Sequence, residues 1–320
     1  MRIAKFVGFA AALACALPAF AKDAVRVVDS QALVFDTYAL YMAKEDGMFD
    51  AENLDVSIIV GRGGTDSLQA VVTGSQDIIY GTGTLGVISA AAKGAPIIML
   101  GNAARGIGEA YWYVPKDSPI KSFKDLDGGK EFAYSTPGSV THLTVQTIAK
   151  ELNIKPKFVS VGAAAASRTQ VMSGQVATAW APFPFGMDMM SKGEIRQIGT
   201  GAESKVLSAT STRVTVANST WLAKNRDVAV RFMRVLGTAQ DKLYADTAKS
   251  AERFAKHWEI PAEAAMQAPK YYQRERNTFT PIVNLDGLLK MAEEYGFLKE
   301  PVAPEQVKKM IDIVYEGAKK

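Results

Sequence analysis

Apolar and polar residues alternate along this chain with two periodicities, one of two residues and one near 3.6 residues. In the first third of the sequence the two periodicities alternate, and glycines mark several of the changes. Gly47 ends a predicted helix that Asp36 is expected to cap, and Gly74 ends the next helix. The predicted order is strand, helix, strand, helix, strand, at residues 25–29, 36–46, 54–60, 65–73 and 76–80.

The same order begins again near residue 130. It predicts strands at 131–134, 157–161 and 176–180 and helices at 139–152 and 163–173. The segments "LQAVVTGSQDIIYG" and "RTQVMSGQVATAWA" share their spacing, because Gly81 lies seven positions after Gly74 and Ala181 lies seven positions after Gly174. The chain therefore contains two copies of one β-α-β-α-β unit.

Strands and helices that alternate with short loops predict mainly parallel sheets with helices on both faces. Two such units predict an α/β protein of two lobes, with residues 22–104 in the first lobe and 105–205 in the second. Residues 206–320 are expected to return to the first lobe, as a strand at 213–217 and then helices such as 228–244 and 306–315. Ligands of parallel sheets bind beyond the carboxyl ends of the strands, so a cleft between the lobes is the expected site.

The first 21 residues have the three parts of a secretory signal peptide. Arg2 and Lys5 give a basic start, an apolar stretch follows, and Ala19-Phe20-Ala21 forms an A-x-A cleavage site. Cleavage after Ala21 predicts an exported, periplasmic protein. A lipidated start at Cys15 is the alternative, although Ala12 stands where a lipidation motif favours Leu.

The composition of the mature chain argues against several kinds of catalytic and metal-binding site. Cys15 is the single cysteine and lies in the leader, so thiol catalysis and cysteine metal sites are not expected. His142 and His257 are far apart in sequence, and no metal or other cofactor is expected. The formal charge is +4, and loss of Arg2 and Lys5 leaves +2, which is not typical of nucleic-acid binding.

Four segments together resemble the periplasmic solute-binding proteins of ABC importers. They are "YMAKEDGMFDAENLDVSII", "GTDSLQAVVTGSQDIIYGTGT", "VPKDSPIKSFKDLDGGKEFAYSTPGS" and "MSGQVATAWAPF". The chain is most similar to the sulfonate, taurine and nitrate binders, a branch that also includes binders of thiamine-pyrimidine precursors. The resemblance implies a type II two-lobe fold without enzymatic activity, a monomer, and partners that consist of an ABC permease with its ATPase. Family members often carry Asp after the tryptophan of the last segment, whereas this chain has Ala181.

The resemblance also implies which loops hold the ligand. The expected ligand-binding residues are Phe35, Gly64, Thr65, Thr82, Gly83, Thr84, Thr136, Gly138, Ser139, Thr141, Trp180 and Phe183. The sequence itself supports one of these positions independently of the resemblance. A helix that starts after Gly138 and Ser139 exposes free N–H groups, and these suit an anion.

Hydroxyl groups and backbone N–H groups dominate these loops, and they suit a sulfonate, nitrate or carboxylate. Nearby aromatic residues, among them Tyr80, Trp180 and Phe185, suit the organic part of a ligand. Three arginines, Arg62, Arg105 and Arg168, are candidates for positive charge, while Asp36 is either a helix cap or a partner of a ligand amine. His142 is expected at the surface.

Two other readings stay open at this point. Gly81-Thr82-Gly83-Thr84-Leu85-Gly86 is a G-x-G-x-x-G sequence after a strand, as in dinucleotide-dependent oxidoreductases, but no acidic residue follows the next strand to bind a ribose. A heterocyclic ligand similar to a thiamine-pyrimidine precursor is the alternative to a small organic anion. A pyrimidine synthase of related fold is disfavoured, because it uses a cysteine-rich motif.

We predict that the mature protein begins at Lys22, because the A-x-A site ends at Ala21. N-terminal sequencing of exported material measures this directly. A chain that begins at a lipidated Cys15, or that retains Met1, contradicts the prediction.

Overall fold

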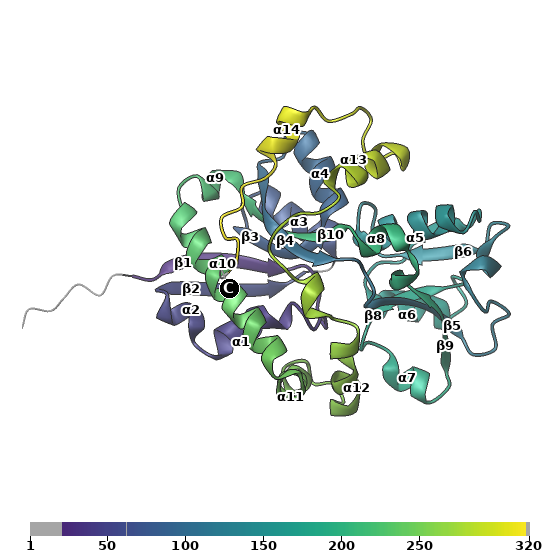
Figure 1. Cartoon of the computed structure of the whole chain (residues 1–320). Helices are drawn as coiled ribbons and strands as arrows, with labels where there is room; N and C mark the ends of the chain where they lie inside the picture. The colour runs from purple at the N-terminus through teal and green to yellow at the C-terminus, as the bar shows by residue number, and fades with distance from the viewer. Residues whose placement is uncertain (1–20, 62, 318–320) are drawn as a thin grey trace, which may run out of the picture.

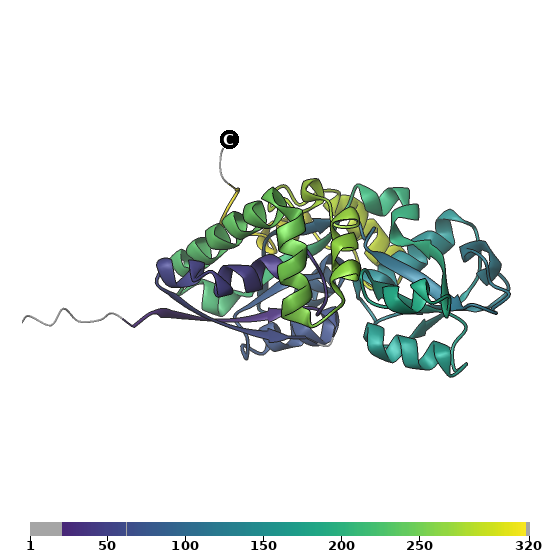
Figure 2. The ribbon, with the colours of Figure 1, turned by 90° about the horizontal axis from the view of Figure 1, so that it is seen from below.

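The computed structural model describes residues 21–61 and 63–317, and it contains two lobes that lie side by side (Figure 1; Figure 2). The signal-peptide prediction and Cys15 fall on residues outside this range, as does Arg62. Within the described residues, no helix combines the length and the apolar character that a membrane crossing requires.

The first lobe is built on a five-stranded sheet in the order β2-β1-β3-β10-β4. Its strands are β1 (Asp23–Asp29), β2 (Leu54–Val60), β3 (Ile78–Gly83), β4 (Ile97–Arg105) and β10 (Ser211–Asn218). β1 pairs with β2 and β3 in parallel, whereas β10 lies antiparallel to both β3 and β4. The chain thus leaves this sheet after β4 and comes back to it more than a hundred residues later.

The second lobe contains β5 (Ala110–Pro115), β6 (Glu131–Tyr134), β7 (Lys157–Ser160), β8 (Ala179–Pro182) and β9 (Ile195–Thr200). β5 is antiparallel to β8 and β9, and β6 pairs with β7 in parallel. The side chain of Thr178 joins the two groups, since its hydroxyl accepts from Ala133 N–H at 3.0 Å and donates to Glu131 C=O at 2.9 Å.

Each lobe therefore has the expected α/β architecture, and each contains one strand that is antiparallel to both of its neighbours, β10 in the first lobe and β5 in the second. Both strands directly follow a crossing between the lobes, so they enter their sheets from the opposite end. The repeat in the sequence predicts the parallel strands, but β5 was missed because it belongs to the crossing and not to the repeated unit.

Helices cover both faces of the first sheet. The helices up to the return strand are α1 (Tyr38–Glu45), α2 (Met48–Ala51), α3 (Gly64–Val72), α4 (Thr84–Ala92), α5 (Val140–Glu151), α6 (Ala164–Met172), α7 (Met187–Ser191) and α8 (Lys205–Ser208). After it come α9 (Ser219–Leu222), α10 (Arg226–Ala245), α11 (Thr247–Trp258), α12 (Ala262–Gln267), α13 (Leu285–Glu294) and α14 (Pro304–Lys309). α1 and α10 pack in one buried cluster with β1, while α3 and α4 pack in another on the same sheet.

The C-terminal segment differs from its prediction. A helix was expected at 306–315, but α14 ends at Lys309 and an extended segment follows. Met99 of β4 donates its N–H to Met310 C=O at 2.8 Å and accepts from Asp312 N–H at 2.9 Å. The prediction was wrong because backbone groups at the edge of β4 pair with this segment, which satisfies them better than a longer helix would.

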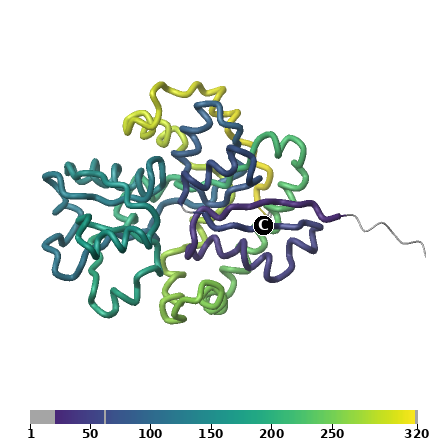
Figure 3. Tube along the Cα trace, turned by 180° about the vertical axis from the view of Figure 1, so that it is seen from behind, coloured from purple at the N-terminus to yellow at the C-terminus, as the bar shows by residue number. Residues whose placement is uncertain are grey.

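α13 lies at the junction of the lobes, where the yellow end of the chain crosses toward the second lobe (Figure 3). It packs against α4 and contacts α5, since Met291 accepts from Thr147 and Glu294 pairs with Lys150 at 2.6 Å. Residues that follow the return strand therefore contact both lobes.

Of the three glycines in the G-x-G-x-x-G sequence, Gly83 and Gly86 lie directly against the second lobe. Gly81 has φ of +76°, which glycine adopts without strain. A Cβ atom on Gly83 would lie 3.1 Å from Val140 N, and one on Gly86 would lie 3.0 Å from Gly138 C=O. In this protein the G-x-G-x-x-G sequence thus lets the start of α4 approach the start of α5, and the backbone of α5 fills the space beside it.

A buried carboxyl group supports the loop between β1 and α1. Asp29 is fully buried at the end of β1, and it accepts hydrogen bonds from Thr37 and Tyr41, both at 3.1 Å. Burial raises the pKa of Asp29 to about 7, although these hydrogen bonds and that from Gln31 N–H lower it in part. Its proton is therefore bound in the folded protein under conditions in which an unfolded Asp is ionised.

We predict that Gly86→Val opens the lobes without unfolding them. The added Cβ meets Gly138 C=O, while valine is preferred over glycine inside a helix by a few tenths of a kcal/mol. Small-angle X-ray scattering should show a larger radius of gyration, and urea unfolding should show parental stability. Scattering identical to that of the parent would disprove the close contact.

We predict that Asp29→Asn removes a pH dependence of stability. The folded state holds a proton that the unfolded state loses between about pH 4 and pH 7, so the free energy of unfolding falls as the pH rises through this window. Urea unfolding at several pH values should show a weaker fall in the variant. The control Asp55→Asn changes an exposed carboxylate of the neighbouring strand and should keep the parental slope. Equal slopes in the parent and Asp29→Asn would count against the buried proton.

Candidate functional site

A cavity with two adjoining compartments lies between the lobes, at the carboxyl ends of the parallel strands. The polar compartment has a volume of about 50 Å³, and its walls come from both lobes. The first lobe supplies Ser30, Gln31, Val34, Gly64, Gly81, Gly83 and Arg213. The crossing and the second lobe supply Ile107, Glu109, Ala110, Ser135, Ser139, Val140, Thr141, Trp180 and Pro182. The second, apolar compartment measures about 150 Å³ and shares Gln31, Ser135, Trp180 and Pro182 with the first.

Three hydroxyl groups form a buried cluster at the start of α5. Ser135 Oγ lies 2.8 Å from both Ser139 Oγ and Thr141 Oγ1, and the latter two oxygens are 3.0 Å apart. Ser139 is the N-cap, because its Oγ accepts from His142 N–H at 3.2 Å. The hydroxyls and the first free N–H groups of the helix therefore meet at the wall of the polar compartment, and together they can donate to an anion.

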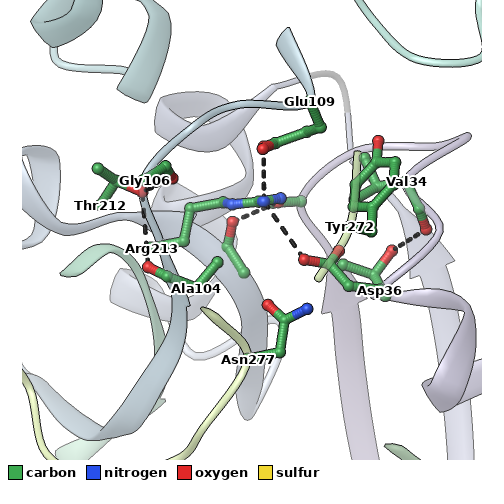
Figure 4. A network of polar contacts seen from close by, with 12 residues as sticks. Val34, Asp36, Ala104, Gly106, Glu109, Thr212, Arg213, Tyr272 and Asn277 are labelled. Carbon is green, nitrogen blue, oxygen red and sulfur yellow. Dashed lines mark hydrogen bonds and ion pairs between the residues drawn. The ribbon is translucent and has the colours of Figure 1, made fainter. Parts of the chain in front are cut away.

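Figure 4 shows a buried ion cluster, of which Arg213 and Glu109 line the polar compartment. Arg213 of β10 is 8% exposed, and its Nη2 donates to Glu109 Oε1 at 2.6 Å and to Asp36 Oδ2 at 3.3 Å. Glu109 directly precedes β5, so one guanidinium connects the loop before α1, the return strand and the crossing. The prediction that Asp36 caps a helix was wrong: α1 begins at Tyr38, and Asp36 pairs with Arg213 instead.

The charges in this cluster influence one another. Burial raises the pKa of both Asp36 and Glu109, and Arg213 opposes this rise. Burial alone would lower the pKa of Arg213, but the two carboxylates raise it. Arg213 stays charged, so the cluster carries a net charge of zero when one carboxyl holds a proton and one negative charge when neither does.

The guanidinium of Arg213 has at least one N–H donor without a hydrogen-bond partner among the described residues. Nη2 makes the two ion pairs, whereas Nε is buried with no hydrogen-bond partner among the described residues, and the same is true of Asp36 Oδ1. A guanidinium has five N–H donors, and an unpaired buried donor costs free energy. A bound polar group or water at the cavity would satisfy such donors.

The predicted ligand-binding residues fall into three groups. Five of them line the polar compartment: Gly64, Gly83, Ser139, Thr141 and Trp180. Three lie where the lobes touch, namely Thr65, Thr136 and Gly138, and Thr65 Oγ1 donates to Pro137 C=O at 2.8 Å. Contact of any of these residues with a ligand stays a prediction.

The remaining four make buried contacts with protein. Thr82 Oγ1 donates to Gly64 C=O at 3.2 Å, and Thr84 Oγ1 donates to Ser211 C=O at 2.7 Å. Phe35 packs among Tyr244, Phe254 and Tyr272. Phe183 is 1% exposed and stacks between Tyr111 and Tyr271, with ring centroids 4.4 Å and 3.7 Å away. These side chains hold the loops of the site in place.

Several other candidates have defined places. Phe185 lines the apolar compartment, and the guanidinium of Arg168 lies 5.2 Å from the centre of its ring. Arg105 donates to Glu275 C=O. His142, expected at the surface, is half-buried and stacks on Tyr134 at 4.0 Å, and burial lowers its pKa to about 4. Within residues 21–61 and 63–317, no group of three or more His, Cys, Asp or Glu is placed to hold a metal ion.

Sequence reasoning missed Arg213 and Glu109. One signal was present, since Arg213 interrupts the otherwise uncharged strand "STRVTVAN", and a charge in a buried strand requires a partner. No local feature identifies Glu109 as that partner, because 104 residues separate the two.

Solved structures with the same fold include several periplasmic binding proteins. The alkanesulfonate-binding protein SsuA of Xanthomonas axonopodis pv. citri, bound to MOPS, has a TM-score of 0.74 and 19% identity, with 91% of this chain and 98% of that chain covered. The aliphatic sulphonate binding protein SsuA of Escherichia coli has a TM-score of 0.70 and 20% identity, with 89% and 91% covered. The nitrate-binding protein NrtA of Synechocystis PCC 6803 has a TM-score of 0.68 and 15% identity, with 91% and 86% covered. These similarities confirm the two-lobe fold.

No curated protein matches the sequence. A family model does match, and it is described as NMT1/THI5 like. The match runs from residue 34 to residue 250, which is 217 of 320 residues and includes the hydroxyl cluster, Glu109 and Arg213. The chain therefore belongs to the NMT1/THI5-like family.

Proposed function

We propose that this protein is the extracytoplasmic substrate-binding component of an ABC import system, and that it captures a small organic anion. The observation that carries the proposal is the hydroxyl cluster of Ser135, Ser139 and Thr141 at the start of α5, which faces the cavity between the lobes. Neutral donors and a helix N-terminus bind sulfonate, nitrate or carboxylate groups without a full countercharge. Structural neighbours that bind sulfonates and nitrate support the same class of ligand.

The ion cluster of Arg213, Asp36 and Glu109 is compatible with a bound anion only if one of its two carboxyl groups is protonated. Two ionised carboxylates beside Arg213 would repel an anionic ligand, whereas a protonated Glu109 or Asp36 leaves the cluster neutral and adds a donor. Burial already raises the pKa of both carboxyls, and an anion nearby raises it further. In this proposal, Arg213 and a protonated carboxyl take part in holding the ligand.

Binding in a cleft between two lobes implies a cycle of capture and release. The ligand enters when the lobes are apart, and contacts with both lobes then favour the closed form. The closed protein docks on a membrane permease whose ATPase subunits drive transport. The A-x-A leader supports export to the periplasm, and we propose that the protein acts there as a monomer, without catalysing a reaction.

A second ligand class has support from a specific observation. Glu109 and Arg213 place a hydrogen-bond acceptor and a donor side by side at the cavity, which suits a heterocycle with adjacent donor and acceptor atoms. The NMT1/THI5-like family model is consistent with a ligand similar to a thiamine-pyrimidine precursor. Such a ligand would depend on Glu109 as its acceptor, whereas an anion would depend mainly on the donors of the hydroxyl cluster.

We predict that small organic anions stabilise the purified protein. A ligand present at about 100 times its Kd adds roughly 2.7 kcal/mol to the free energy of unfolding, which raises Tm by several degrees. A thermal-shift screen should include sulfonates, nitrate, carboxylates, aminopyrimidines, neutral sugars and cationic amines.

The variants Ser139→Ala and Glu109→Gln separate the two ligand classes. For an anion held by the hydroxyl cluster, Ser139→Ala should cost about 1 kcal/mol of binding free energy, and Glu109→Gln should cost less. Stabilisation by cations or neutral sugars alone would refute the anion proposal, and stabilisation by aminopyrimidines alone would favour the second ligand class.

A further inference from the structure

The apolar compartment is lined mainly by apolar residues, so it does not suit the charged head group of an anion. Its walls include Leu33, Ala164, Ala165 and Phe185, and it shares Trp180 and Ser135 with the polar compartment. A group bound at the hydroxyl cluster would therefore have this space directly next to it. The two compartments form one site with a polar and an apolar end.

The apolar compartment is about three times as large as the polar one, and this difference limits which part of a ligand each can hold. The polar compartment, at about 50 Å³, has room for little more than a head group. The apolar compartment, at about 150 Å³, is of the size at which a protein cavity with apolar walls stays dry and accepts benzene. It is larger than nitrate or a methyl group requires and suits a single six-membered ring.

Small and aromatic side chains make up much of the lining of the compartment. Three consecutive alanines, 163–165, form one wall at the start of α6, where larger side chains would fill the space. Trp180 also lines the compartment, and its Nε1 donates to Gly162 C=O at 3.1 Å, which fixes the indole. Phe185 stands at the rim with Arg168 over its ring. Aromatic walls of this kind favour an aromatic guest.

The backbone conformation of Leu33, which also lines the apolar compartment, is a further indication that the compartment is functional. Leu33 has φ of +63°, a left-handed conformation that is unfavourable for a bulky side chain. Strain of this kind is found mainly at binding and catalytic sites, where the surrounding structure maintains it. Here it places Leu33 at the apolar compartment, within the loop that also supplies Gln31 to both compartments.

We infer that the ligand is an anion that carries one aromatic ring, with its anionic group at the hydroxyl cluster and its ring in the apolar compartment. The inference rests on the proposed function, and it narrows the ligand from any small organic anion to a benzoate-like or benzenesulfonate-like compound.

Matched pairs of anions test the inference on the parent protein. Isothermal titration calorimetry should compare benzenesulfonate with methanesulfonate, and benzoate with acetate. Burial of a ring should make the aromatic member of each pair bind at least about tenfold more tightly. Equal affinities within each pair would overturn the inference and leave the proposed function standing. A protein that binds none of the four anions would overturn both.

A pair of variants then locates the ring. Ala165→Leu fills the apolar compartment from an exposed position of α6, and Ala166→Leu makes the same change at the next exposed residue, which does not line it. Ala165→Leu should lower the affinity for benzenesulfonate at least about tenfold and leave that for methanesulfonate within about twofold. Ala166→Leu should match the parent for both. Unchanged benzenesulfonate affinity in Ala165→Leu, in a variant with the parental Tm, would overturn the placement of the ring.

Discussion

The pairing of Arg213 with Glu109 and Asp36 is the interaction on which the arrangement of the site depends. A guanidinium at 8% exposure loses most of its hydration, and this cost is repaid only if partners of opposite charge stay in good geometry. One partner belongs to the loop before α1 and the other to the crossing that precedes β5. The loop, the return strand and the crossing are therefore held together, because loss of the return strand would leave two buried carboxyls without their cation, and loss of either carboxyl would remove a partner of the buried guanidinium.

This constraint also shapes the chemistry of the cavity. Arg213 is a fixed positive charge whose influence is largely offset by two acids, so the site does not attract anions by simple charge. In the proposed function, selection relies instead on the hydroxyl cluster and the helix start, whose donors are neutral and line the same compartment.

The sequence predicted the parts of the fold that local chemistry controls. The strands Leu54–Val60 and Glu131–Tyr134 were placed at their observed ends, and Ser139 was identified as the start of α5. Gly74 and Gly174, which marked the repeat, have φ of +75° and +74° at equivalent helix ends. These features depend on a few adjacent residues, and so the sequence pattern reveals them.

Long-range contacts were not predictable in the same way. Phe183 appeared to be a loop aromatic suited to a ligand, but Tyr271, almost ninety residues later, stacks on it. Gly83 and Gly86 looked like a dinucleotide motif, but their partner is the backbone at Gly138 and Val140. In both cases the local pattern was recognised, and its meaning was decided by a segment that the pattern does not contain.

The same long-range contacts affect how the lobes can move. The two crossings alone would form a simple hinge, but residues 271–297 make a third connection. On one side Tyr272 donates to Phe183 C=O at 2.7 Å, and Lys150 pairs with Glu294. On the other side Ser89 donates to Phe297 C=O at 3.0 Å, and α13 packs on α4. Wide opening must therefore release one of these sets of contacts or bend the segment. The glycine contact between α4 and α5, by comparison, consists mainly of backbone atoms, so its separation requires less free energy than release of these side-chain contacts.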